Sequence, residues 1–110
     1  MTETLKILGQ QCPTANSPTT LYTVPGSTSA VVSALTICNQ NSTSVKVRAW
    51  IAVGGASLNT KQYICYDTRI PPNMPPLEVM HGVPLATTDV VKVQADTANV
   101  SFNLSGSELT

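Results

Sequence analysis

Apolar and polar residues alternate along several short stretches of this chain. The clearest is 44–53, where one face carries Val45, Val47, Ala49, Ile51 and Val53 and the other carries Lys46, Arg48, Trp50 and Ala52. Residues 90–95 and 100–105 repeat the same period of two. Because successive side chains of a strand point to opposite faces of a sheet, this period predicts half-buried β-strands.

Other stretches predict further strands. Residues 30–38 are almost continuously apolar, which favours a central strand covered on both faces. Residues 62–70 predict a strand with Tyr63, Cys65, Asp67 and Arg69 on one face and Ile64, Tyr66, Thr68 and Ile70 on the other. Short strands are expected over 21–24 and 77–80, with 4–8 as an additional edge strand. Stiff β-branched residues dominate these stretches, and no stretch of the sequence requires a helix.

Seven or eight short strands between regular turns predict an all-β fold. We expect a single antiparallel β-sandwich domain over residues 1–110, immunoglobulin-like or jelly-roll in topology. The polar segment 9–20 is expected to form an arm that reaches away from the core. Residues 71–76 contain four prolines and are expected to form a stiff, exposed loop. Residues 82–84 are expected to form a turn.

Composition narrows the functional classes. The 110 residues include six Lys and Arg and six Asp and Glu, and only 11% are charged. Balanced, scattered cations argue against nucleic-acid binding, which needs clustered positive charge. The 42% of hydrophobic residues exclude a disordered chain, and no apolar run reaches the roughly 18 residues of a membrane span. So few charges leave a free monomer poorly soluble, so we expect partners, copies of this chain among them, to cover much of its surface.

The inventory of reactive side chains is small. Cys12, Cys38 and Cys65 lack the spacing of a zinc or redox motif. The first ten residues do not look like a secretion signal, so we expect reduced thiols that pack as small buried side chains; a disulfide or a reactive thiol is the alternative. His81 is the single histidine, and Glu78, three positions earlier on an expected strand, should point to the opposite face. We therefore expect no enzymatic activity, metal or cofactor.

Trp50 lies on the face of 44–53 opposite the valine stripe, beside Lys46 and Arg48. Three interpretations stay open: packing in the core or at its rim, an exposed anchor in a protein interface, or a platform for stacking sugar rings. The candidate partner-contact residues are Trp50, Arg48, Tyr63, Tyr66, Arg69 and Met74.

Short phrases throughout the chain resemble one group of proteins. They are Leu8–Gln10, Thr20–Pro25, Val31–Ser33, Ile37–Asn39, Lys61–Ile64, Thr88–Val93 and Ser101–Glu108. Together they resemble the small virion structural proteins of tailed bacteriophages, notably those that infect cyanobacteria and marine bacteria. This resemblance implies a particle component, on the capsid surface or in the tail, with no enzymatic role.

The sequence thus leads to an expected function. It is that of a capsid decoration or cement protein, which stabilises contacts between major capsid subunits by strand addition and avidity. The expected partners are the major capsid protein and other copies of this chain, with no nucleic acid and no membrane. The expected location is the virion, after synthesis in the host cytoplasm. A tail, neck or baseplate component and a glycan- or host-binding module are the alternatives.

Overall fold

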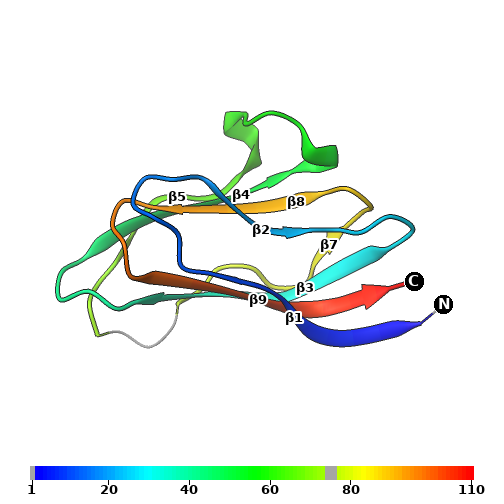
Figure 1. The fold of residues 1–110 in the computed structure, drawn as a ribbon, viewed down its shortest axis with the longest axis horizontal. Helices are drawn as coiled ribbons and strands as arrows, with labels where there is room; N and C mark the ends of the chain where they lie inside the picture. The colour runs from blue at the N-terminus through cyan, green and yellow to red at the C-terminus, as the bar shows by residue number, and fades with distance from the viewer. Residues whose placement is uncertain (1, 74–76) are drawn as a thin grey trace.

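The computed structural model describes residues 2–73 and 77–110 and contains two antiparallel sheets packed face to face (Figure 1). The first sheet consists of β1 (Glu3–Gln11), β9 (Val100–Leu109), β3 (Ser29–Asn39), β6 (Leu77–Glu78) and β7 (Val83–Leu85). The second consists of β2 (Thr19–Thr23), β8 (Val90–Ala95), β4 (Val45–Ala52) and β5 (Tyr63–Ile70). Two 3₁₀ turns, η1 (Val53–Gly55) and η2 (Thr60–Gln62), connect β4 to β5. The predicted all-β sandwich is confirmed.

The strand order is that of a jelly roll. The first sheet runs β1-β9-β3-β6, with β7 pairing the same strand β3, and the second runs β2-β8-β4-β5. Since β6 and β7 share one position beside β3, each sheet has four strand positions, in agreement with the expected seven to eight strands. The first strand pairs with the last, and each later pair is nested inside the one before. This nested order distinguishes the jelly roll from the immunoglobulin-like alternative.

The core lies between the two sheets, where the alternating stripes meet. Val47, Ala49 and Ile51 lie opposite Ala95, Val93 and Val91 in the β4–β8 ladder. From the first sheet, Val32, Leu35 and Ile37 of β3 and Val100, Phe102 and Leu104 of β9 are fully buried. The period of two therefore predicted the inner faces of β4, β8 and β9 correctly.

Three expectations about these elements are wrong. β3 alternates between buried and half-buried residues, so only its inner face is covered, although strands flank it on both edges. β4 ends at Ala52, and Val53 turns out into η1, exposed. The expected turn at 82–84 instead contains the start of β7, where Pro84 is accommodated because β7 is an edge strand.

The expected arm at 9–20 is not an arm. Residues 9–11 pair with β9, and residues 19–20 pair with β8. The connection between them carries the chain from one sheet to the other, and the Asn16 backbone N–H donates to the Ala95 carbonyl at 2.7 Å. In the proline-rich segment, residues 74–76 lie outside the described residues, and the candidate Met74 lies there too.

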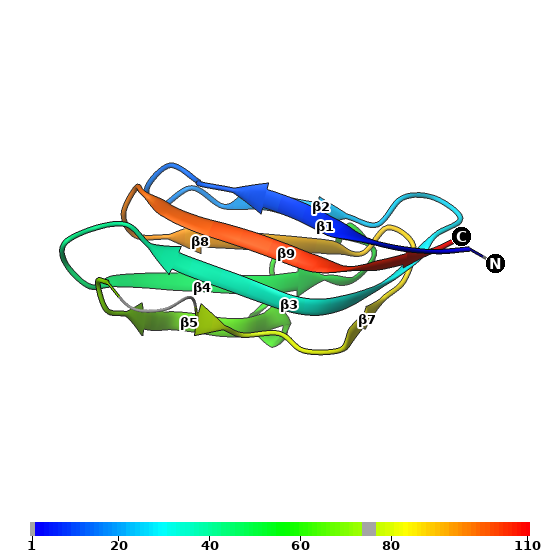
Figure 2. The ribbon, with the colours of Figure 1, turned by 90° about the horizontal axis from the view of Figure 1, so that it is seen from below.

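The two ends of the chain lie side by side (Figures 1 and 2). Thr2 and Thr110 exchange both backbone hydrogen bonds, at 2.8 and 2.9 Å, and extend the β1–β9 ladder. A few residues further on, β1 crosses close to β2 of the opposite sheet at Gly9. A methyl group added to Gly9 would overlap the Leu21 carbonyl oxygen. The absence of a side chain at Gly9 is therefore what allows the two sheets to meet at this corner.

We expect Gly9→Ala to lower the free energy of unfolding by about 2 kcal/mol, as overpacking typically does. The backbone carbonyl at Leu21 cannot move aside without disturbing β2. Gly26→Ala is the matched control, because a methyl group there has no neighbour within 4 Å. Urea unfolding of both variants measures the difference. Equal stabilities would contradict the proposed close crossing.

Candidate functional site

Four of the predicted contact residues form one cluster on the outer face of the second sheet. The Arg48 guanidinium carbon lies 4.2 Å from the centre of the Tyr66 ring. Tyr66 meets Tyr63 edge-to-face, with ring centres 4.8 Å apart, and Tyr63 meets Trp50 in the same way at 5.6 Å. We refer to Arg48, Trp50, Tyr63, Tyr66 and Asp67 as the aromatic cluster.

Asp67 fixes the position of Arg48. Arg48 donates from Nε to Oδ1 of Asp67 at 2.7 Å and from Nη2 to Oδ2 at 3.2 Å. This two-point hydrogen bonding orients the guanidinium plane. It also raises the pKa of Arg48 and lowers the pKa of Asp67, so both groups are charged at neutral pH. The cluster thus presents an arginine and a half-exposed tyrosine in a fixed arrangement.

Two irregularities in β5 create the cluster. The β4–β5 register shifts between Val47 and Ala49 and again between Ala49 and Trp50. Asp67 has a positive φ of 51°, the left-handed conformation found at many bulges. The predicted simple alternation over 62–70 is therefore wrong: the extra residues let Tyr63 and Tyr66, three apart in sequence, meet on one face. The sequence carries no clear signal of this bulge, because the residue with the positive φ is Asp67 and not a glycine.

Trp50 is buried, with only 2% of its surface exposed. It lies outside the sandwich core, where Tyr63 contacts it and the connection from η1 to η2 lies near it. Together with Pro18, Leu58 and Lys92, among others, it lines a hollow of about 250 Å³. Of the three interpretations of Trp50, rim packing is correct, and an exposed anchor or sugar platform at this residue is wrong. Trp50 instead packs against the Tyr63 ring.

Arg69, another predicted contact residue, is exposed and makes none of the contacts within the aromatic cluster. It lies opposite Lys46 in the β4–β5 ladder. Neither side chain forms an ion pair within residues 2–73 and 77–110. The structure thus places two like charges side by side on the outer face of the second sheet, an arrangement that is unfavourable in isolation.

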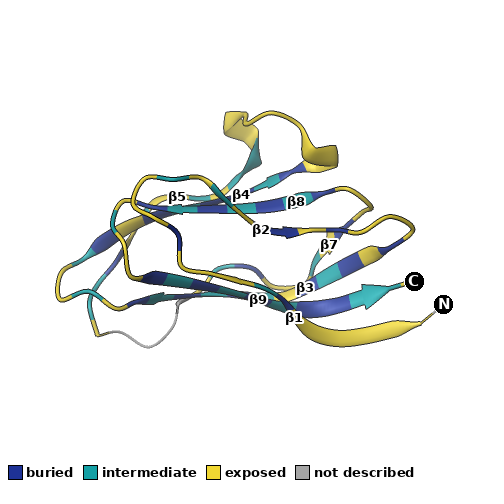
Figure 3. Cartoon of the chain, viewed as in Figure 1, coloured by how far each residue is buried: buried dark blue, intermediate teal, exposed yellow. Residues whose placement is uncertain are grey.

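A second candidate surface, which the sequence interpretation did not single out, is the free edge of β1. Leu5 is 78% exposed and Ile7 is 54% exposed. Figure 3 shows the first half of β1, residues 3–7, as exposed throughout. Hydrogen-bonded and non-hydrogen-bonded pairs alternate along an antiparallel ladder. Because Thr2 and Thr110 form a bonded pair, the N–H and C=O groups of Glu3, Leu5 and Ile7 point away from β9. Apolar residues at every second position of the expected edge strand were the available signal.

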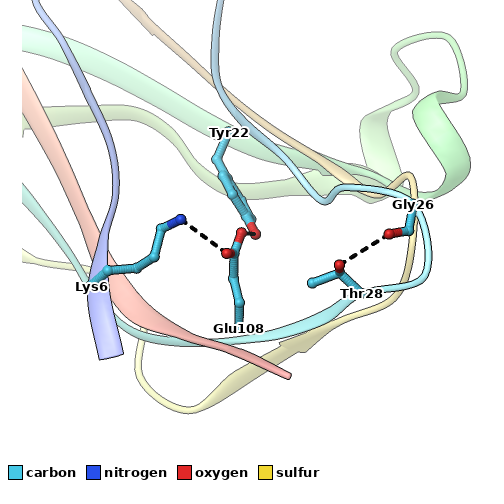
Figure 4. Close-up of polar contacts among 5 residues, drawn as sticks. All are labelled: Lys6, Tyr22, Gly26, Thr28 and Glu108. Atoms are coloured by element: carbon cyan, nitrogen blue, oxygen red, sulfur yellow. Dashed lines mark hydrogen bonds and ion pairs between the residues drawn. The ribbon is translucent and has the colours of Figure 1, made fainter. Parts of the chain in front are cut away.

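The lysine of this edge is turned inward (Figure 4). Lys6 Nζ lies 2.9 Å from Oε1 of Glu108, and the Tyr22 hydroxyl donates to Oε2 at 2.5 Å. These three residues come from β1, β9 and β2, so they also tie the two sheets together. The Tyr22 hydrogen bond and the Lys6 ammonium lower the pKa of Glu108. Burial and the same carboxylate raise the pKa of Tyr22. The inward Lys6 leaves the outer face of this half of β1 without a cation.

The other reactive side chains do not assemble. His81 Nε2 lies 3.8 Å from Oε2 of Glu78, contrary to the expectation that they face apart, because β6 ends at Glu78 and the chain turns. This pair is exposed. Cys12, Cys38 and Cys65 are free thiols; Cys12 is exposed, so the expectation that it is buried is wrong. Burial raises the pKa of the Cys65 thiol, which disfavours a reactive thiolate there.

A hollow of about 670 Å³ opens between the β4–β5 connection and β7. Its walls are mainly apolar, including Ile51, Ile64 and Leu85. Asp89 lines it, but both carboxylate oxygens are occupied, by the backbone N–H groups of Gly54 and Ala86 at 2.9 Å each. Asp89 therefore acts as a structural acceptor that holds two turns.

Within residues 2–73 and 77–110, no group of three or more His, Cys, Asp or Glu side chains is placed to bind a metal ion. No helix in this part of the chain combines the length and apolar character needed to cross a membrane. No protein-family model matches the chain, and no curated protein and no solved structure matches it either.

Tyr63→Ala should expose Trp50 to solvent, because the Tyr63 ring packs against its edge. We expect acrylamide to quench the single tryptophan more strongly in this variant than in the wild type. Tyr66→Ala is the control, since Tyr66 contacts Tyr63 and Arg48. A tryptophan quenched as strongly in the wild type as in the unfolded chain would disprove the burial of Trp50.

Glu108→Gln should make stability less dependent on pH. The pKa of Glu108 is lower in the folded than in the unfolded protein, so its contribution is present above the unfolded pKa and is lost as pH falls through the folded pKa. We expect the wild type to lose stability on acidification below the ordinary glutamate pKa, and the variant to lose less. Thermal unfolding between neutral pH and strongly acidic pH measures this. Glu3→Gln, at an exposed position of the neighbouring strand β1, should retain the wild-type profile.

Proposed function

We propose that this protein is a structural component of a tailed-phage particle, and specifically a capsid decoration or cement protein. In this role it holds neighbouring major capsid subunits together from the capsid surface. The resemblance of its sequence phrases to small virion structural proteins gives the class. The observation that carries the mechanism is the free edge of β1.

Edge strands of soluble proteins are often protected by prolines or by charged side chains, especially lysines, on the exposed edge. The half of β1 from Glu3 to Ile7 contains no proline, its lysine is engaged by Glu108, and Leu5 and Ile7 are exposed. A strand added here would gain main-chain hydrogen bonds from Glu3, Leu5 and Ile7 and apolar contact with the two exposed side chains. An extended segment of a capsid subunit fits this description.

The fold is compatible with the proposal but does not establish it. Jelly rolls occur in viral capsid and in lectin domains, so the fold alone supports a virion role only by analogy. The buried Trp50 gives no support to the glycan-binding alternative, which relied on that side chain. A tail, neck or baseplate component would use the same free edge, and only the number of copies distinguishes it from a cement protein.

Copy number in purified particles tests the proposal. A shell component should be present at about one-third to one copy per major capsid subunit, whereas a tail component at a single axis should be near one per hundred. Quantitative mass spectrometry against the major capsid protein gives this ratio. A ratio near one per hundred would favour the tail, and absence from particles would reject the virion role.

Leu5→Pro tests the free edge. The N–H of Leu5 points away from β9, so proline at this position removes a free donor and leaves the β1–β9 ladder intact. We expect at least tenfold weaker binding to capsids that lack this protein, roughly the loss of one well-placed contact, with a melting temperature close to that of the wild type. Leu5→Lys is a second variant that protects the edge with charge. Wild-type binding by both folded variants would exclude strand addition at β1.

A further inference from the structure

The strands of the two sheets in this neutral protein differ in the sign of their net charge, although Asp89 and Asp96 flank β8 of the second sheet. Four of its six cationic side chains, Lys46, Arg48, Arg69 and Lys92, lie on strands of the second sheet, where Asp67 is the single acid. The strands of the first sheet carry Glu3, Glu78 and Glu108 against Lys6. Strand charges therefore give +3 for the second sheet and −2 for the first. The overall net charge of zero does not reveal this separation.

The positive charge is directed outward. The inner positions of β4 and β8 are filled by Val47, Ala49, Val91 and Val93, so the cations between them face away from the core. Lys46 and Arg69 lie directly opposite each other and have no ion-pair partner in the described part of the chain. Two like charges in this position repel each other. An acidic group docked between them would remove that repulsion.

The aromatic cluster lies on the same face as this cation pair. Arg48 is held by Asp67 and stacked on Tyr66, whose surface is 56% exposed. Tyrosine and arginine are among the residue types that most often dominate binding energy at protein interfaces, and fixed side chains lose little entropy on binding. The face thus combines a rigid central contact with unpaired positive charge beside it.

We propose that the outer face of the second sheet is a docking surface for an acidic protein surface, with Lys46 and Arg69 pairing with carboxylates and Tyr66 and Arg48 packing at the centre. A polyanion such as nucleic acid fits less well, because Asp67 lies within the patch and phosphate binding needs more clustered cations. This surface is distinct from the β1 edge, which belongs to the other sheet. Two surfaces on opposite sheets would let one molecule bridge two neighbours. The inference depends on the proposed function in one respect: its test uses capsids as the binding partner.

The test measures binding to capsids that lack this protein, from about 50 to about 500 mM NaCl, a range over which screening becomes strong. We expect Arg69→Glu to weaken binding about tenfold at low salt and to flatten the salt dependence. This variant creates an opposite-charge pair with Lys46, so it should fold. Lys61→Glu makes the same change of charge on η2, off the strands of this face, and should stay within about twofold of the wild type.

Tyr66→Ala tests the centre of the surface and should weaken binding about tenfold at all salt concentrations. If Arg69→Glu and Tyr66→Ala bind as the wild type while Leu5→Pro does not, the docking surface is refuted and the proposed function stands. If the wild type does not bind capsids at all, the proposed function fails instead. Equal or tighter binding to a 30-base-pair DNA duplex, or self-association lost in the same variants, would refute an acidic protein as the occupant.

Discussion

Burial of the alternating stripes on β3, β4, β8 and β9 is the constraint on which the rest of this structure depends. A shift of one residue in any of these strands would exchange its inner and outer faces, so burial fixes the register. Once Val47, Val93 and Phe102 are inside, Arg48 and Lys92 must be outside. The outward direction of these cations is thus a consequence of core packing.

Strict alternation would nevertheless have produced a different outer face. Irregular pairing in β5 brings Tyr66 beside Tyr63, two residues that strict alternation would place on opposite faces. Each candidate surface includes an edge strand with an irregular ladder: β5, and β1, whose register shifts after Ile7. Local departures of this kind commonly redirect side chains near functional sites. The buried core stabilises the sandwich. The irregular edge strands determine which side chains meet on its outer surface.

How far the sequence predicts this protein follows from the same distinction. Inner faces could be predicted because burial leaves a period of two in the sequence, as in 90–95 and 100–105. The nested strand order could not, since it depends on pairings between distant segments such as β1 and β9, for which a single sequence carries no local signal. The exposure of Trp50 was undetermined because the connection after β4 decides it. The left-handed backbone of Asp67 could not be predicted from its residue type, so neither could the contact between Arg48 and Tyr66.

The paired ends of the chain determine how the protein responds to mechanical load. A force applied between residues 2 and 110 would pull β1 away from β9 sideways and break the ladder one bonded pair at a time, beginning with Thr2 and Thr110. A force applied between the β1 edge and the outer face of the second sheet would instead be shared by many hydrogen bonds and by the packed core at once. The molecule is therefore weak when pulled by its ends and strong when loaded across its two sheets. A component that clamps neighbours under internal pressure would experience the second kind of load.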